Sequence, residues 1–160
     1  TARIIMKLIV TNIVQDTPTV KIYTLRHPIH PALPKQSAGA HVDVRLPDGK
    51  IRQYSLCGSP DDESEYRIAV RRESTGRGGS CWLHDNVEIG SVLHVTAPRN
   101  NFPLVTEAKR NVFIAGGIGI TPFSSIANIV TSLEGVSISL FPTDPITSPF
   151  SLAMFPKSPT

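Results

Sequence analysis

Four consecutive residues near the middle of the chain combine a cation, an aromatic ring and a hydroxyl group. They are Arg52, Gln53, Tyr54 and Ser55, in a stretch typical of a β-strand. The planar guanidinium of arginine binds phosphate through paired, charge-assisted hydrogen bonds. A neighbouring aromatic ring offers a flat surface to a planar ligand, and a serine hydroxyl can donate to a ring atom. On these residues alone, a surface arginine beside a half-buried tyrosine is the commoner explanation.

A glycine-rich segment follows later in the chain, at Gly76-Arg77-Gly78-Gly79-Ser80. Successive glycines allow backbone N–H groups to converge on an anion, and a helix that starts there adds a partial positive charge. We expect a short helix from Ser80 to Asn86, with Ser80 as its N-cap. A flexible loop and an RGG-like nucleic-acid segment are the alternatives. The second is disfavoured because the motif occurs once, without interleaved aromatic residues.

A second glycine-rich turn, Gly-Gly-Ile-Gly-Ile-Thr-Pro at 116–122, comes directly after the apolar run 112–115. Such a run is typical of a strand buried on both faces in a parallel sheet. Thr121 can cap a helix whose first position is Pro122. The turn does not match the dinucleotide fingerprint Gly-x-Gly-x-x-Gly. The third glycine of that motif is missing, and Pro122 stands where the motif continues into its helix. It still places a helix N-terminus at the carboxyl end of a strand, where open α/β sheets bind ligands.

The elements that would position these motifs are mainly β. Residues 4–105 are expected to form a six-stranded antiparallel β-barrel, and 110–141 the truncated start of an α/β nucleotide-binding domain. This second part would be a first βαβ piece, with a helix to about Leu133. A proline-rich irregular tail is expected over 142–160. The expected strands are 7–14, 20–25, 41–46, 52–56, 66–72 and 92–97, followed by 112–115 and 136–140.

The composition excludes several classes of protein. With 160 residues the chain has room for about one domain. No stretch approaches the roughly 20 apolar residues of a membrane helix, and the first residues do not form a secretory signal. Cys57 and Cys81 are too few for an iron–sulfur cluster or a zinc site, so we expect no metal and a reduced, cytoplasmic protein. A disulfide between them stays open, and the net charge of +3 permits an anionic partner.

Taken together, the three motifs resemble those of ferredoxin-reductase-type flavoproteins, most closely the phthalate dioxygenase reductase family, over roughly residues 5–135. In that family the R-x-Y-S strand, the basic strand leading into G-R-G-G-S, and the G-G-I-G-I-T-P turn all meet the flavin. The resemblance implies a ferredoxin reductase-like FAD/FMN-binding barrel. It also implies FMN as the cofactor, with FAD as the second choice, and NAD(P)H as the electron donor.

The resemblance implies roles for individual residues around the flavin. Arg52 would hold the flavin phosphate, Tyr54 would pack on the ring, and Ser55 would hydrogen-bond near its redox-active edge. Arg71 and Arg72 would supply positive charge that favours the reduced, anionic flavin. The full expected flavin-binding set is Arg52, Gln53, Tyr54, Ser55, Val70, Arg71, Arg72, Gly78, Gly79, Ser80, Cys81 and Thr121.

The resemblance also implies a function. Thr121 would lie where the nicotinamide approaches the flavin, flanked by Gly117 and Gly119, and Ser55 and Thr121 are the candidate catalytic residues. Electrons would pass from NAD(P)H through FMN to an iron–sulfur acceptor. That acceptor would be a 2Fe–2S ferredoxin domain, or the oxygenase component of a ring-hydroxylating or demethylating system. Neither a nucleic acid nor a membrane is expected as a partner.

The sequence departs from the family pattern in two ways. It contains no late Cys-Gly-Pro segment, which in that family helps to place the nicotinamide, and no C-x4-C-x2-C cluster motif. We therefore expect flavin binding with slow NADH oxidation and no iron–sulfur cluster in this chain. The alternatives are a catalytically silent flavin-binding fragment and an FAD-type ferredoxin or flavodoxin reductase domain. A basic barrel that binds nucleic acid is the weakest alternative, because aromatic platforms are missing.

Overall fold

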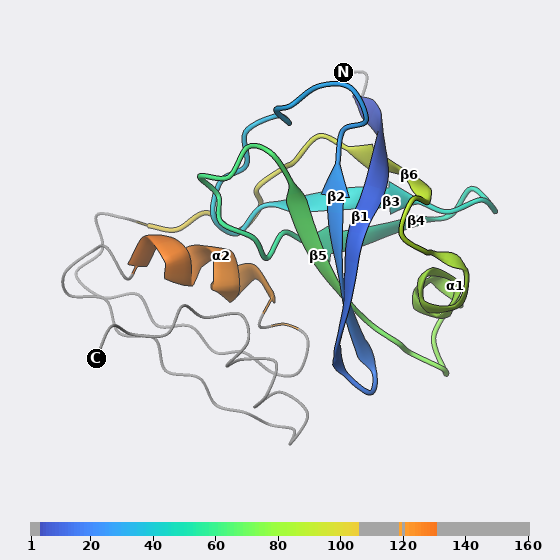
Figure 1. Cartoon of the computed structure of the whole chain (residues 1–160). Coiled ribbons are helices and arrows are strands. Elements are labelled where there is room, and N and C mark those ends of the chain that lie inside the picture. Colours follow the sequence, from blue (N-terminus) through green and yellow to red (C-terminus); the bar gives the residue numbers. More distant parts are fainter. Residues whose placement is uncertain (1–3, 106–118, 120, 131–160) are drawn as a thin grey trace.

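The computed structural model describes residues 4–105, 119 and 121–130, with side chains up to Ile126. In this part of the chain, six antiparallel strands form one sheet, and two helices flank it (Figure 1). The helices lie at opposite ends of the curled sheet. The elements are β1 (Ile5–Thr17), β2 (Val20–Arg26), β3 (His41–Arg45), β4 (Ile51–Ser55), β5 (Tyr66–Arg71), α1 (Gly79–Asn86), β6 (Val92–Thr96) and α2 (Thr121–Val130).

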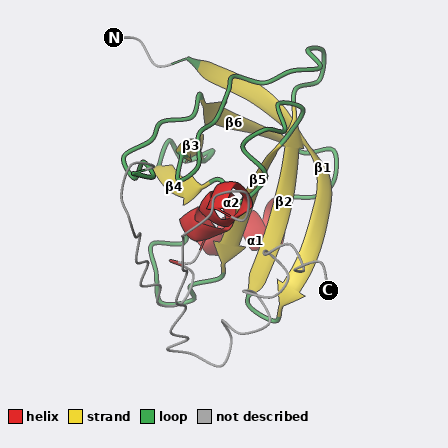
Figure 2. Ribbon diagram, turned by 90° about the vertical axis from the view of Figure 1, so that its left-hand side faces the viewer, coloured by secondary structure: helices red, strands yellow, loops and turns green. Residues whose placement is uncertain are grey.

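The sheet is strongly curled but is not closed into a complete barrel. Its strand order is β4-β3-β6-β1-β2-β5, so β4 and β5 are the two edges. Figure 2 shows β3, β4 and β6 on one side of the curl and β1, β2 and β5 on the other. The edges meet only just beyond β4, through an isolated bridge between Leu56 and Ile68 and a 2.9 Å bond from Cys57 N–H to the Arg67 carbonyl. The prediction of a mainly β, six-stranded antiparallel fold is confirmed. The barrel is not closed, because β4 and β5 do not form a continuous ladder.

Strand β1 is much longer than predicted because it pairs with two neighbours in succession. Its first half, from Ile5 to Ile9, pairs with β6, and its second half, from Ile9 to Thr17, pairs with β2. The second ladder shifts register between Val10 and Asn12 and again between Gln15 and Thr17. The two pairing partners come from distant parts of the chain, so the full length of β1 does not follow from its own residue pattern.

Helix α1 is fixed to the sheet by three buried or half-buried polar contacts. The phenol of Tyr23, itself fully buried, donates a 3.0 Å hydrogen bond to the Leu83 carbonyl. Lys21 Nζ donates to the His84 carbonyl at 2.9 Å, and His84 Nε2 donates to the Val70 carbonyl at 2.8 Å. Together with the packing of Leu83 in the core, these contacts hold α1 against β2 and β5. The start of the helix is therefore held in a set position.

Helix α2 packs against the loops at the other end of the curled sheet. The Ser124 hydroxyl donates to the Cys57 carbonyl at 3.1 Å, and Gly39 N–H donates to the Ser125 hydroxyl at 3.0 Å. The rings of Phe102 and Phe123 meet edge to face, 5.7 Å between centroids. The helix predicted after the second glycine turn is present. The strands predicted at 112–115 and 136–140 and the tail at 142–160 lie outside the described residues.

Two expectations about helices and cysteines are settled by the described residues. Helix α1 begins at Gly79 rather than Ser80, and its N-cap is Gly78, which has φ +79° and makes no side-chain cap. Cys57 and Cys81 are both free thiols, so no disulfide joins them. None of the helices in the described segments is long and apolar enough to cross a membrane.

A cleft at the open edge of the sheet

A cleft of about 490 Å³ opens where β4 and β5 separate. This volume lies within the range of pockets that hold small molecules. All three sequence motifs contribute to its walls, although they are far apart in the chain. The lining residues are Arg52, Gln53, Tyr54, Ser55, Ala69, Arg71, Glu73, Gly76, Arg77, Gly79, Ser80, Gly119, Thr121 and Pro122.

Arg52 is positioned by direct contact with the glycine-rich loop. Its Nη2 donates to the Arg77 carbonyl at 3.3 Å, and its Nη1 donates to the Ile51 carbonyl at 2.9 Å. The side chain passes so close to Gly79 that a Cβ there would lie 2.7 Å from Arg52 Nε. A side chain at position 79 would displace the arginine, so glycine is required here. The guanidinium therefore lies beside the first turn of α1.

The start of α1 supplies backbone donors next to this arginine. The first intrahelical bond runs from Trp82 N–H to the Gly78 carbonyl at 2.9 Å, so the N–H groups of Gly79, Ser80 and Cys81 have no acceptor within the helix. A left-handed residue followed by helical ones turns successive N–H groups toward one side, which suits an anion. The helix dipole adds partial positive charge at the same place. Arg52 and the start of α1 together give one end of the cleft the donors and the positive charge that suit an anion.

Ser80 lines the cleft, and its hydroxyl also stabilises the loop that precedes α1. Its Oγ accepts a 3.0 Å hydrogen bond from Glu73 N–H, which ties the loop after β5 to the start of α1. Because a hydroxyl can accept and donate at once, its proton remains available to a ligand.

Tyr54 and Ser55 form the middle of the cleft along β4. Tyr54 packs against the hydrophobic core, and burial raises its pKa to about 12, while Arg52 nearby acts in the opposite direction. The phenol is therefore neutral at physiological pH and presents an uncharged aromatic surface. Gln53 lies at the rim and donates through Nε2 to Asp43 Oδ1 at 3.4 Å. From Arg52 to Ser55 the strand extends about 10 Å, at roughly 3.3 Å per residue.

The far end of the cleft is the start of α2. Gly119, Thr121 and Pro122 line it, and Thr121 is buried. Ser124 of the same helix contacts the Cys57 carbonyl, two residues after Ser55, so α2 lies beyond the Ser55 end of β4. Two helix N-termini therefore face one cleft, α1 at the Arg52 end and α2 at the Ser55 end. Each favours negative charge in a ligand.

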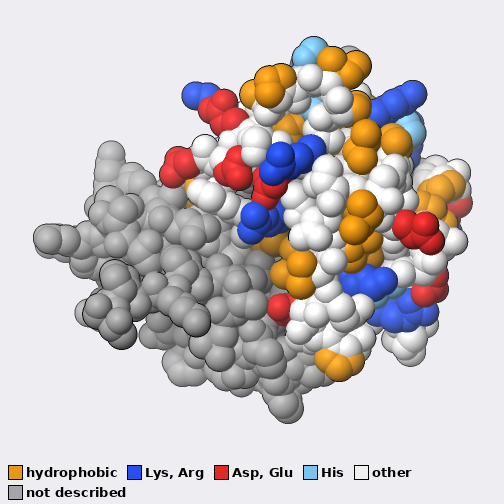
Figure 3. Space-filling model, in the orientation of Figure 1, with side chains coloured by type: hydrophobic (Ala, Val, Ile, Leu, Met, Phe, Trp, Pro, Cys, Tyr) orange, Lys and Arg blue, Asp and Glu red, His pale blue; other side chains and the backbone are white. Residues whose placement is uncertain are grey.

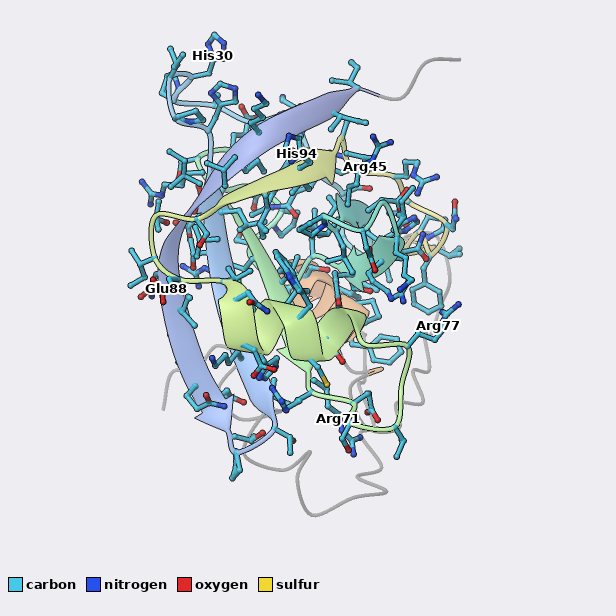
Figure 4. All side chains as sticks on the ribbon, turned by 90° about the vertical axis from the view of Figure 1, so that its right-hand side faces the viewer. His30, Arg45, Arg71, Arg77, Glu88 and His94 are labelled. Atoms are coloured by element: carbon cyan, nitrogen blue, oxygen red, sulfur yellow. The ribbon has the colours of Figure 1, made fainter. Side chains whose placement is uncertain are left out.

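Glu73 and Ala69 line the cleft, although the sequence pattern did not single them out. Arg71 Nε lies 3.2 Å from Glu73 Oε1, so part of the positive charge of Arg71 is neutralised by a carboxylate of the cleft itself. Figure 4 shows Arg71 at the end of β5 and Arg77 on the loop that leads to α1. Ala69 follows from strand alternation, since Ala69 and Arg71 share one face of β5 while Ile68 and Val70 point into the core.

Four residues of the expected flavin-binding set do not line the cleft. Val70 is fully buried in the core, and Arg72 pairs with Asp85 of α1. Gly78 lines a neighbouring hollow next to Trp82, and the Cys81 thiol donates to the Glu73 carbonyl at 3.4 Å. Gly117, expected on the nicotinamide side, lies outside the described residues. The other expected residues, Arg52, Gln53, Tyr54, Ser55, Arg71, Gly79, Ser80, Gly119 and Thr121, come together in the cleft.

Charge on one face of the molecule is mixed. On the face in Figure 3, acidic and basic side chains of the described residues lie among each other, with apolar side chains between them. Within the segments that the structure describes, no three His, Cys, Asp or Glu side chains come together in a way that could hold a metal ion. The cationic side chains that line the cleft are those of Arg52, Arg71 and Arg77.

Comparison with known proteins gives this architecture a family context. No model of a protein family matches the sequence. The chain is 47% identical over 119 residues to the phthalate 4,5-dioxygenase oxygenase reductase subunit of Pseudomonas putida. That alignment covers 74% of this chain but 37% of the subunit, so the chain spans well under half the length of this relative.

Two solved structures match the fold closely. An intact type IV self-sufficient cytochrome P450 monooxygenase superposes with a TM-score of 0.87 at 38% identity, covering 94% of this chain and 20% of that protein. Phthalate dioxygenase reductase, described as a modular structure for electron transfer from pyridine nucleotides to a 2Fe–2S cluster, superposes with a TM-score of 0.82 at 35% identity. This match covers 89% of this chain and 45% of the reductase.

A curled six-stranded sheet followed by a helix is the fold of the ferredoxin reductase-like flavin-binding domains. The chain is a homologue of the reductase subunits of oxygenase systems, phthalate dioxygenase reductase among them. The resemblance inferred from the three motifs is thereby confirmed.

Proposed function

We propose that the chain is the flavin-binding module of an NAD(P)H-dependent oxygenase reductase, with FMN as its cofactor. One observation carries this proposal: a single cleft has an arginine and the start of α1 at one end, an aromatic residue in the middle, and the start of α2 at the other end. A flavin mononucleotide has a terminal phosphate, a planar ring and a reactive edge in the same order. When bound, a flavin accepts hydride from a reduced pyridine nucleotide and passes the electrons on.

The residues of the chain would then bind and orient the cofactor. Arg52 and the free N–H groups of Gly79 and Ser80 would hold the phosphate, because the fork of donors and the helix dipole act on the same anion. Neutral Tyr54 would pack against the ring, and an aromatic contact of this kind contributes about 0.5–1.5 kcal/mol beyond the area that it buries. The Ser55 hydroxyl would hydrogen-bond to the ring at the end nearest α2.

The start of α2 would receive the nicotinamide nucleotide. Thr121 and Gly119 would form the wall that the nicotinamide meets, and hydride transfer requires that its reactive carbon lie about 3–3.5 Å from the flavin. Arg71 would contribute less positive charge than a free arginine because of its pair with Glu73, and Arg72 would act only at longer range because it pairs with Asp85. Electrons would then pass to an iron–sulfur acceptor, either a 2Fe–2S ferredoxin domain or an oxygenase component.

FMN is proposed over FAD because the Arg52 guanidinium and the backbone N–H groups of α1 converge at one end of the cleft, where a single terminal phosphate would bind, and the start of α2 at the other end is assigned to the nicotinamide nucleotide. Loading the purified chain with an equimolar mixture of FMN and FAD, then desalting and denaturing it mildly, should release FMN without adenine. Retention of FAD instead would move the protein to the FAD-type reductases. Retention of neither flavin would contradict the proposed function.

A second measurement concerns the electron donor. The FMN-loaded chain is mixed without oxygen with NADH, with NADPH or with dithionite, and the visible absorbance of the flavin is followed. We expect rapid bleaching by dithionite and slow bleaching by a pyridine nucleotide. Bleaching by dithionite alone would identify a flavin-binding module without its own nicotinamide reaction.

A further inference from the structure

A second hollow lies on the outer face of the sheet, across β1, β3, β4 and β6. Its volume is about 110 Å³, and none of its lining residues belongs to the flavin cleft. Figure 4 shows Arg45 and His94 next to each other on this face, and the two residues are opposite one another in the β3–β6 ladder. The lining residues are Ile5, Asp43, Arg45, Ile51, His94 and Thr96.

The basic side chains of this face have no partner of their own in the described part of the chain. There, neither Arg45 nor His94 forms an ion pair or a side-chain hydrogen bond, and the same holds for Lys7. Lys7 lies opposite His94 in the β1–β6 ladder, so three basic residues are in register across three strands. The guanidinium of Arg45 and the ring of His94 can each donate a hydrogen bond to an anion bound between them.

The one carboxylate in the hollow is already engaged. Asp43 Oδ2 accepts from Arg99 Nη2 at 2.6 Å, and Oδ1 accepts from Gln53 Nε2 at 3.4 Å. Its side chain is only 5% exposed, and the charge of Arg99 compensates its own. The negative charge of Asp43 is therefore compensated by Arg99, and the donors of Arg45 and His94 are available to a ligand.

Apolar side chains close the two ends of the hollow. Ile5 on β1 is 42% exposed and Ile51 on β4 is 46% exposed, both high values for isoleucine within a sheet. Ile51 lies directly opposite Arg45 in the β3–β4 ladder. A ligand that fills this space needs one anionic group for the basic side chains and an apolar body for the isoleucines.

We propose that this hollow binds a small carboxylate with an apolar body, and we take benzoate as the probe. The carboxylate would accept hydrogen bonds from the Arg45 guanidinium and from the His94 ring, and the body would lie between Ile5 and Ile51. Arginine suits this task because its donors match both carboxylate oxygens. The proposal does not depend on flavin binding, since the two sites share no lining residue.

The test is a titration of the full chain, labelled with nitrogen-15, with sodium benzoate. Saturable shifts of the backbone amide signals of Arg45, His94 and Thr96 are expected. Benzamide, the neutral analogue, and acetate, which lacks the apolar body, should each bind at least about tenfold more weakly, the equivalent of 1.4 kcal/mol. Benzoate shifts that fail to saturate, or that sodium chloride reproduces at the same ionic strength, would overturn the proposal. Equal binding of benzamide or of acetate would do the same.

Two variants separate direct contact from general charge. R45Q should weaken benzoate binding at least about tenfold, because it removes the donor fork. K7Q removes the charge of Lys7, which is in register with His94 and Arg45 but lies outside the hollow. It should change the affinity for benzoate by no more than about twofold. Both residues are exposed, and unchanged amide spectra elsewhere would verify folding. If R45Q bound benzoate as tightly as the unaltered chain, or if R45Q and K7Q lost the same affinity, the contact between Arg45 and the carboxylate would be ruled out.

Discussion

Arg52 and Gly79 are in contact: a Cβ on Gly79 would lie 2.7 Å from Arg52 Nε and 2.9 Å from Arg52 Cγ. These separations are shorter than any stable non-bonded contact between such atoms. The R-x-Y-S strand and the G-R-G-G-S loop are therefore parts of one structure, in which the missing side chain of one motif makes room for the cation of the other. The Arg52 end of the cleft depends on this fit.

The first prediction follows from that contact. Gly79→Ala should displace the guanidinium and weaken FMN binding about tenfold or more, the equivalent of 1.4 kcal/mol, measured by quenching of flavin fluorescence. In an Arg52→Ala background the same change should have little effect, because the group that it displaces is gone. Gly58→Ala is the matched control, since its Cβ would meet Arg67 at an ordinary 3.6 Å. Additive losses in the double variant would contradict this account.

The second prediction concerns the chemistry of the cation. Arg52→Ala should lose most of the bound flavin, and Arg52→Lys should retain more than alanine but less than arginine, because lysine keeps the charge without the donor fork. Flavin occupancy per chain, read from absorbance after desalting, measures both. Equal occupancy in all three proteins would remove Arg52 from the site.

The third prediction concerns stability against pH. Burial lowers the pKa values of His41 and His84, so the unfolded chain takes up protons on these rings at a higher pH than the folded chain does. The free energy of unfolding should therefore fall as the pH is lowered through the ordinary histidine pKa of about 6.5. Thermal melting at pH values between about 7.5 and 5.5 measures this dependence.

Two variants identify the histidine responsible. His84→Gln keeps a donor for the Val70 carbonyl but cannot titrate, so its melting temperature should depend less on pH than that of the unaltered chain. His30→Gln, on an exposed loop, should leave the dependence unchanged. A pH dependence that is the same in all three proteins would assign the effect to other groups.

The fourth prediction distinguishes the two thiols. Burial raises the pKa of Cys57 to about 12, and its Sγ donates to the Arg67 carbonyl at 3.4 Å, whereas Cys81 is partly exposed at the start of α1. Iodoacetamide should therefore modify Cys81 and leave Cys57 intact until the chain unfolds, because the thiolate is the reactive form. Mass spectrometry of the folded and denatured chain counts one and two modifications. Rapid modification of Cys57 in the folded chain would mean that its burial is wrong.

Much of the fold could be predicted from the sequence because the strands carry a clear period of two. In His41–Arg45 and Tyr66–Arg71 every second residue belongs to the hydrophobic core, and the predicted ends of those strands lie within a residue of the observed ones. The gap between β4 and β5 could not be predicted, since edge pairing depends on contacts between segments distant in the chain. The same reason explains why the length of β1, with its two ladders, was underestimated.

The sequence predicted those residues of the cleft whose type alone indicates their chemistry. Arg52, Tyr54 and the loop glycines have few alternatives at those positions. Glu73 was missed because a single carboxylate after a strand carries no pattern, and its pairing with Arg71 exists only in three dimensions. Alternation along β5 also predicts that Ala69, like Arg71, faces the cleft, whereas the side chain of Val70 lies in the core.

Flavin retention by the unaltered chain tests the central claim most directly. The purified protein is incubated with excess FMN, passed through a desalting column, and compared with Arg52→Ala treated in the same way. The cleft built from Arg52, Tyr54 and the start of α1 predicts one FMN per chain in the unaltered protein and almost none in the variant. A colourless unaltered protein, or equal retention by both, would contradict the claim that this cleft binds flavin.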